Sequence, residues 1–165
     1  MNSKKTKTNK IWGQRMKSKP SYLLTKINAS IDIDKKLYAQ DIKASIAHTK
    51  MLVKQQIIKK DISNKIIKGL KKIEKEIQQK KFRFSVLNED IHLNIEKRLF
   101  EIIGNEAGYL HIARSRNDQV TTDFKLWTIE ASKALKIEIK NLIKAILKLA
   151  EKNKDVIMPG FTHLK

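Results

Sequence analysis

The sequence has 165 residues, of which 41% are hydrophobic, so it is long and apolar enough to build the core of one ordinary domain. It contains no cysteine, which excludes a disulfide framework, a thiolate nucleophile and a cysteine metal site, and indicates a reducing cytoplasm. No apolar run reaches about 18 residues, and the start of the chain lacks the apolar stretch of a signal peptide. We therefore expect a folded cytoplasmic protein with no membrane partner.

The formal net charge is +19, which is typical of proteins that bind nucleic acid or an anionic surface. The excess is diffuse, however, because residues 1–19 hold six lysines and one arginine and the rest is spread over the remaining chain. Only five of the 36 basic residues are arginine, as expected when A/T-rich codons favour lysine at permissive surface positions. The charge therefore predicts no specific nucleic-acid partner.

Two helices are predicted in the first half of the chain. Residues 1–10 have no apolar periodicity and should form a disordered basic tail. From residue 11 to 24, glycine, proline and scattered basic residues predict an extended arm. Apolar residues then recur every three to five positions, which predicts a helix over 34–54. After Gln55 and Gln56 a second helical face follows, formed by Ile62, Ile66, Ile67, Leu70, Ile73 and Ile77.

A third helix is predicted to start after the acidic segment that ends at Asp90 and to close at Gly104, which suits a C-terminal cap. His92 and Glu96 are four positions apart, so they share one face of this helix. They permit a hydrogen-bonded pair or two metal ligands, but two ligands do not complete a metal site. A buried histidine satisfied at a helix interface is an equally good interpretation, and no metal site is predicted.

The longest predicted helix covers 120–152, where no proline or glycine interrupts the pattern. Lysines recur every four residues from Lys136 to Lys152 and predict a solvated stripe. The opposite face should contact a core. Three shorter helices cannot cover so long a helix, so we expect association with other copies or with missing sequence. The apolar face consists of Phe124, Trp127, Leu135, Ile139, Leu142, Ile143, Ile146 and Leu149.

Polar side chains crowd the segment 110–120, directly before this helix. Arg114, Arg116 and Asn117 lie beside the donors and positive end of a helix N-terminus, which together favour a carboxylate or phosphate ligand. A plain helix start explains the pattern equally well, with Asn117 or Asp118 as the N-cap and solvated arginines.

Five stretches occur in an order that resembles the argininosuccinate lyase family of the fumarase and aspartase superfamily. The Ser-Arg-Asn-Asp-Gln run and the Pro-Gly-aromatic-Thr-His-Leu run are the most specific of these motifs. The resemblance extends from about residue 12 to the last residue. The motifs are Trp12-Gly13-Gln14-Arg15, Asn28-Ala29-Ser30-Ile31-Asp32 with Asp34, Glu89-Asp90-Ile91-His92-Leu93-Asn94, Ser115-Arg116-Asn117-Asp118-Gln119, and Pro159-Gly160-Phe161-Thr162-His163-Leu164.

The resemblance implies an all-α fold, with an N-terminal helical lyase domain over 11–112 and the first long helix of the superfamily helix bundle within 113–165. It implies the reversible elimination of argininosuccinate to arginine and fumarate, the last step of arginine biosynthesis, with no cofactor. By position, His163 is the acid/base residue. Ser30, Asn117 and Thr162 match substrate contacts, and Arg116 is an added substrate-binding candidate.

The family also implies a homotetramer in which each site combines segments from separate subunits. This sequence resembles roughly the first third of a subunit and lacks the loop that carries the catalytic serine. We therefore expect the chain alone to be inactive, and to need other subunits or a complementing C-terminal fragment. It departs from the family at Gln14, Met16, Ile112 and Lys165. Two alternatives remain: a non-catalytic helical interaction protein derived from a lyase, and a basic nucleic-acid-binding helical protein.

Overall fold

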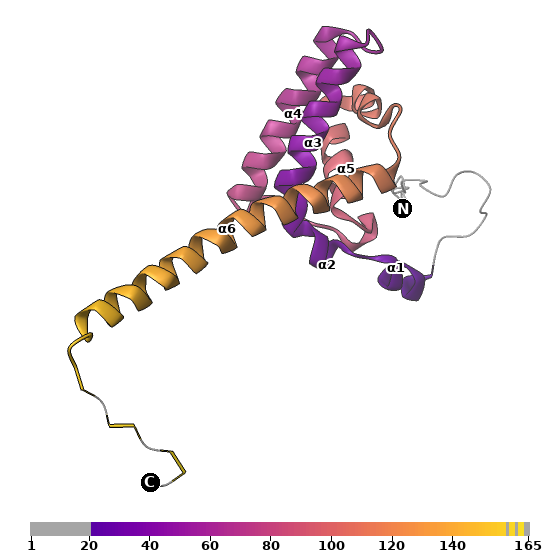
Figure 1. Cartoon of the computed structure of the whole chain (residues 1–165). Coiled ribbons are helices and arrows are strands. Elements are labelled where there is room, and N and C mark those ends of the chain that lie inside the picture. The colour runs from indigo at the N-terminus through magenta and orange to yellow at the C-terminus, as the bar shows by residue number, and fades with distance from the viewer. Residues whose placement is uncertain (1–20, 158, 161, 164–165) are drawn as a thin grey trace. The chain divides into compact units, whose positions relative to one another are not determined.

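The computed structural model describes residues 21–157, 159–160 and 162–163 (Figure 1). Within these residues every regular element is helical, so the predicted all-α fold is confirmed. The predicted tail over 1–10 and most of the predicted arm lie outside the described residues. The α-helices are α1 (Tyr22–Asn28), α2 (Ile31–Asp34), α3 (Tyr38–Lys54), α4 (Lys60–Gln78), α5 (Ile91–Ile103) and α6 (Arg116–Lys152). The 3-10 helices are η1 (Lys35–Leu37), η2 (Val86–Asn88) and η3 (Gly104–His111).

The chain divides into two compact units between Ile112 and Ala113, and each is described by itself. In the first unit, α3 and α4 lie side by side and α5 packs against α4 (Figure 1). Their shared core is almost entirely aliphatic. Each fully buried isoleucine or leucine side chain contributes roughly 1.5–3 kcal/mol relative to exposure. The core residues include Ile31, Ile42, Ile66, Leu70, Ile73, Ile91, Ile95, Leu99 and Leu110.

The predicted apolar face of α4 is the one that the fold buries. Ile66, Leu70 and Ile73 recur at three- and four-residue intervals and are fully buried. On α3 the prediction is less accurate, because Met51 is 39% exposed. The buried stripe of α3 instead includes polar residues such as Ser45 and Thr49. The Thr49 hydroxyl donates to the Ser45 carbonyl at 2.8 Å, so it keeps a hydrogen-bond partner although it is buried.

The ends of α5 are set by side-chain and backbone chemistry, as predicted. Asp90 is the N-cap, and its carboxylate accepts the Leu93 N–H at 2.7 Å. Gly104 follows the last residue with φ 73°, a conformation that favours glycine because it has no Cβ. The sequence pattern did not predict that the chain continues after Gly104 as the 3-10 helix η3. Leu110 of η3 is 1% exposed and extends the core.

A buried hydrogen bond links α3 to α5. His92 donates its Nδ1 hydrogen to Asp41 Oδ1 at 3.0 Å, and both side chains are 1% exposed. The histidine is therefore a satisfied interface residue, which is one of the two interpretations that the sequence left open. Glu96 Oε1 lies 3.5 Å from His111 Nδ1.

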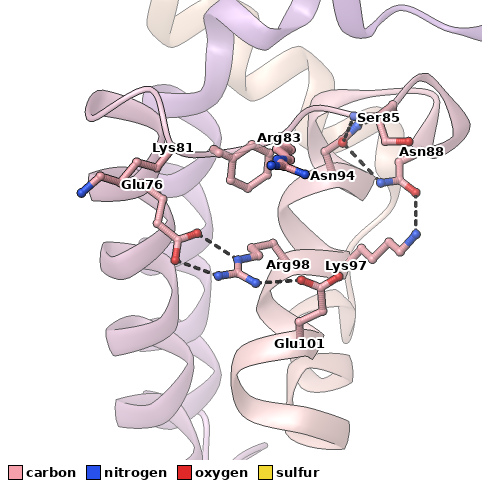
Figure 2. A pocket seen from close by; sticks show the side chains of 10 residues that line it. Glu76, Lys81, Arg83, Ser85, Asn88, Asn94, Lys97, Arg98 and Glu101 are labelled. Atoms are coloured by element: carbon pink, nitrogen blue, oxygen red, sulfur yellow. Dashed lines mark hydrogen bonds and ion pairs between the residues drawn. The ribbon is translucent and has the colours of Figure 1, made fainter.

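The segment between α4 and α5 is held by a polar network (Figure 2). The side-chain oxygen of Asn94 accepts the Ser85 N–H at 2.8 Å, and the side-chain amide of Asn94 donates to the Ser85 carbonyl at 3.1 Å. Figure 2 also shows the Arg98 guanidinium between two acids: it donates twice to Glu76 at 2.9 Å and once to Glu101 at 2.8 Å. Both carboxylates raise the pKa of Arg98. The fork fixes α5 against α4 because two parallel bonds allow only one orientation.

The second unit contains α6, which has 37 residues and is roughly 55 Å long at about 1.5 Å per residue. It starts at Arg116, four residues before the predicted start, because Ser115 caps it. The apolar face that was predicted to meet a core is exposed in this chain. Its eight side chains, from Phe124 to Leu149, are 41–64% exposed. The expected association with other copies or missing sequence stays a prediction.

Gly69→Ala is predicted to destabilise the first unit. Gly69 is buried on α4, and a Cβ there would clash with Leu99 Cδ1 in the packed core. Alanine favours the helix by about 1 kcal/mol, whereas overpacking costs about 1–3 kcal/mol, so we expect a net loss of roughly 1 kcal/mol. Urea unfolding measures it. Lys68→Ala, at an exposed neighbouring position, is the control and should be neutral or slightly stabilising. Equal stability gains in both variants would contradict the packing argument.

The pair formed by Glu76 and Arg98 is predicted to make stability depend on pH. The hydrogen bonds from Arg98 hold the pKa of Glu76 below its usual value of 4.5. A carboxyl whose pKa is lowered by folding stabilises the protein above the unfolded-state pKa and loses this contribution as pH falls through the folded-state pKa. Glu76→Gln should therefore cost about 1 kcal/mol at pH 7, and this cost should shrink in acid below the unfolded-state value.

Urea unfolding at pH values from neutral to acidic measures this dependence. The control is Glu151→Gln, which changes an ion pair whose carboxylate side chain is 76% exposed, and it should alter stability little at any pH. A cost for Glu76→Gln that stays constant with pH would contradict the electrostatic explanation.

Candidate functional site

Three groups of side chains make up the predicted site, and the first lies at the start of α6. Ser115 is the N-cap: its hydroxyl accepts the Asn117 N–H at 3.2 Å, and its own N–H donates to Asp118 Oδ2 at 3.2 Å. This reciprocal capping box corrects the prediction that Asn117 or Asp118 caps the helix. With Ser115 as cap, the side chain of Asn117 is not used for capping and is exposed.

The charged side chain at this helix start is oriented by its neighbours. Arg116 Nη1 donates to Gln119 Oε1 at 2.8 Å, one turn further along α6. A helix N-terminus carries about half a positive charge, and the guanidinium adds a full one. An amide and a cation at such an end suit a carboxylate, because both supply hydrogen-bond donors.

The second group surrounds Ser30, in the first unit. The N–H groups of Ser30 and Ile31 both donate to the Glu89 carbonyl, at 2.9 and 3.0 Å. Glu89 has φ 55°, an uncommon conformation for a residue with a side chain, and it turns this carbonyl toward α2. The Ser30 side chain is exposed, and its hydroxyl donates to Asp34 Oδ2 at 2.6 Å.

The carboxylate of Asp34 is shared between α2 and the first turn of α5. Its second oxygen, Oδ1, accepts the Ile91 N–H at 3.1 Å. Burial raises the pKa of Asp34 above its usual 3.8, opposed by the hydrogen bond from Ser30, while the charge of Asp90 adds to the rise. Asp34 belongs to one of the sequence motifs but was not a predicted site residue. Its spacing of four residues from Ser30 was the signal that could have placed the two side chains together.

The third group, Thr162 and His163, follows α6, and both residues are exposed. From Asn117 to Lys152 the helix spans about 52 Å at roughly 1.5 Å per residue. The eleven residues from Lys152 to His163 reach at most about 38 Å when fully extended. Even a tail folded straight back along α6 would leave the α-carbons of His163 and Asn117 about 14 Å apart. One copy of the chain therefore does not bring His163 and Asn117 together.

A cavity of about 510 Å³ lies between α4, the 81–88 segment and α5 (Figure 2). None of the predicted site residues lines it. The side chains that line it mostly bind one another, as Lys97 Nζ does when it donates to Asn88 Oδ1 at 3.3 Å. This network positions the segment that leads into Glu89, whose carbonyl accepts the N–H groups of Ser30 and Ile31.

The sequence model of a family described as lyase matches residues 14–165. The chain therefore belongs to this lyase family, which is part of the fumarase and aspartase superfamily. No helix among the described residues is long and apolar enough to cross a membrane.

Two curated relatives are both argininosuccinate lyases. The argininosuccinate lyase of Pelagibacter ubique is 61% identical over 155 residues, which cover 94% of this chain and 34% of the relative. The argininosuccinate lyase of Bartonella bacilliformis is 49% identical over 158 residues, covering 96% of this chain and 34% of the relative. The chain thus spans about a third of the length of the curated relatives that it matches.

Proposed function

We propose that this chain is the N-terminal third of an argininosuccinate lyase, a carbon–nitrogen lyase that converts argininosuccinate reversibly to arginine and fumarate in arginine biosynthesis. The identity of 61% over nearly the whole chain carries the proposal. In this assignment, residues 11–112 form the N-terminal helical lyase domain and 113–165 begin the central helix bundle. The absence of cysteine supports a cytoplasmic location.

The elimination requires a base, an acid and donors for developing charge. A base removes a proton beside a carboxylate, donors hold the resulting dianionic intermediate, and an acid protonates the departing guanidino nitrogen. We assign the acid/base role to His163, because an imidazole can both accept and donate a proton. Asn117 and Arg116, at the positive start of α6, suit a substrate carboxylate. Thr162 and Ser30 supply hydroxyl groups, and the proposed reaction uses no cofactor.

The active site in this proposal is assembled from more than one copy of the subunit. Two observations support it. The length of α6 keeps His163 and Asn117 of one copy apart, and its apolar face is exposed along most of the helix. A face of this length would be covered by the α6 helices of other copies and by further chain of the kind that the curated relatives have beyond the matched third. A homotetramer fits both observations.

Activity should depend on the missing portion. We expect the 165-residue chain alone to release no measurable fumarate, because it lacks the loop expected to carry the catalytic serine. Losing such a group together with water exclusion costs several orders of magnitude in rate. Co-expression with the C-terminal portion of the Pelagibacter ubique relative should restore fumarate release, measured by ultraviolet absorbance. In this complex, His163→Asn should lower the rate by at least about 100-fold and Asn117→Ala by about tenfold or more.

The matched control is His111→Asn, which replaces an exposed histidine of η3 and should leave the rate of the complex nearly unchanged. Rapid turnover by the chain alone would contradict the proposed division of the site. Rescue that survives His163→Asn would show that another residue carries the acid/base role.

The exposed face of α6 should drive self-association of the chain. Replacing Ile139 and Ile146 together by lysine places two charges in the middle of the apolar face, which we expect to weaken association by at least about tenfold. Sedimentation velocity at several protein concentrations measures the effect. Lys140→Gln and Lys144→Gln on the lysine stripe form the control. A chain that stays monomeric at all concentrations, or an equal effect of both double variants, would contradict this role for the apolar face.

A further inference from the structure

We propose that Asp34 is a positioning residue that holds the hydroxyl proton of Ser30, so that Ser30 meets the substrate as a hydrogen-bond acceptor and recognises its cationic N–H groups. The inference rests on the proposed function and deepens it, because it assigns one end of the substrate to one part of the site.

The hydrogen bond between Ser30 and Asp34 has only one possible direction, from the hydroxyl to the carboxylate. A serine hydroxyl has one hydrogen and two lone pairs. The hydrogen of Ser30 is directed to Asp34 Oδ2 at 2.6 Å, a distance typical of a strong bond from a hydroxyl to a carboxylate. Toward a ligand, Ser30 then presents lone pairs. A lone pair attracts an ammonium or guanidinium hydrogen and repels a carboxylate.

The second step is the rigidity of the acceptor. Asp34 cannot turn away from Ser30 without losing the bond that its Oδ1 accepts from the Ile91 N–H at 3.1 Å. Ser30 itself is held because its N–H, like that of Ile31, donates to the Glu89 carbonyl. Three hydrogen bonds thus join α2 and its N-cap to the segment at the start of α5, and the bond from Ser30 to Asp34 is a fourth within the α2 segment. This arrangement fixes both the hydroxyl oxygen and the direction of its hydrogen before a ligand binds.

The third step is charge. The carboxylates of Asp34 and Asp90 lie close enough for Asp90 to raise the pKa of Asp34, and His92 acts on Asp34 in the opposite direction. The negative charge of the two carboxylates, Asp34 and Asp90, favours a cation beside Ser30. The start of α6 has the opposite character, because Arg116 adds its charge to the positive helix end. Argininosuccinate carries a guanidinium and an ammonium group as well as carboxylates, so the two groups of residues suit different parts of it.

The experiment compares the two products in the complex of this chain with the C-terminal portion of the Pelagibacter ubique relative. Arginine carries the cationic groups, and fumarate carries only carboxylates. Isothermal titration calorimetry measures the affinity for each. Asp34→Asn keeps the size of the side chain but leaves one carbonyl oxygen for two donors. We expect affinity for arginine to fall by about tenfold or more, with affinity for fumarate unchanged within about twofold.

Two further variants separate a positioning role from a structural one. Ser30→Ala should give the same selective loss of arginine affinity, while it leaves the Asp34 bond to Ile91 in place. The double variant should bind arginine no more weakly than Ser30→Ala, because Asp34 acts through Ser30. The matched control is Asp32→Asn, which changes a carboxylate that is 88% exposed on the same helix and should alter neither affinity.

Each other outcome overturns the inference in a recognisable way. Equal losses for arginine and fumarate in Asp34→Asn would indicate a general structural role. A selective loss of fumarate would show that Ser30 donates to a carboxylate. Additive losses in the double variant would mean that Asp34 contacts the ligand directly. A wild-type complex that binds neither product and releases no fumarate would overturn the proposed function, and this inference with it.

Discussion

The first unit depends on the aliphatic contact between α4 and α5. Ile66, Leu70 and Ile73 on one helix and Ile95 and Leu99 on the other are fully buried in one aliphatic cluster. This burial sets the position of α5, and Gly69 allows the close approach of Leu99 that it requires. The Arg98 fork to Glu76 adds orientation at the edge, where a salt bridge contributes less energy than the core but restricts rotation.

The position of α5 in turn decides where the Ser30 group lies. Its first residue, Ile91, and the preceding Glu89 supply the donor and the acceptor that hold Asp34 and Ser30. An exposed hydroxyl near a chain turn would ordinarily sample several rotamers. Here the Ser30 hydroxyl is oriented by Asp34, which is held in turn by Ile91, more than fifty residues away in sequence. A change in core packing that moves α5 would therefore also move the proposed substrate contact.

The second unit depends on the length of α6. One copy of this helix keeps the residues at its two ends apart and leaves its apolar face exposed. A rigid helix of 37 residues carries Asn117 at one end and leads to His163 beyond the other. In the proposed enzyme this length becomes useful, since antiparallel copies of such a helix would bring the end of one copy to the start of another. The same association would cover the apolar face.

The sequence by itself determined the all-α class, the apolar face of α4, both ends of α5 and the long helix, because these features depend on local periodicity and capping chemistry. It also determined the family, through short motifs. Only the tertiary structure showed that Asp34 joins Ser30 to Ile91, that His92 pairs with Asp41, and that Glu89 turns its carbonyl toward α2. These contacts join residues that are distant in sequence, and periodicity carries no information about which distant partners meet.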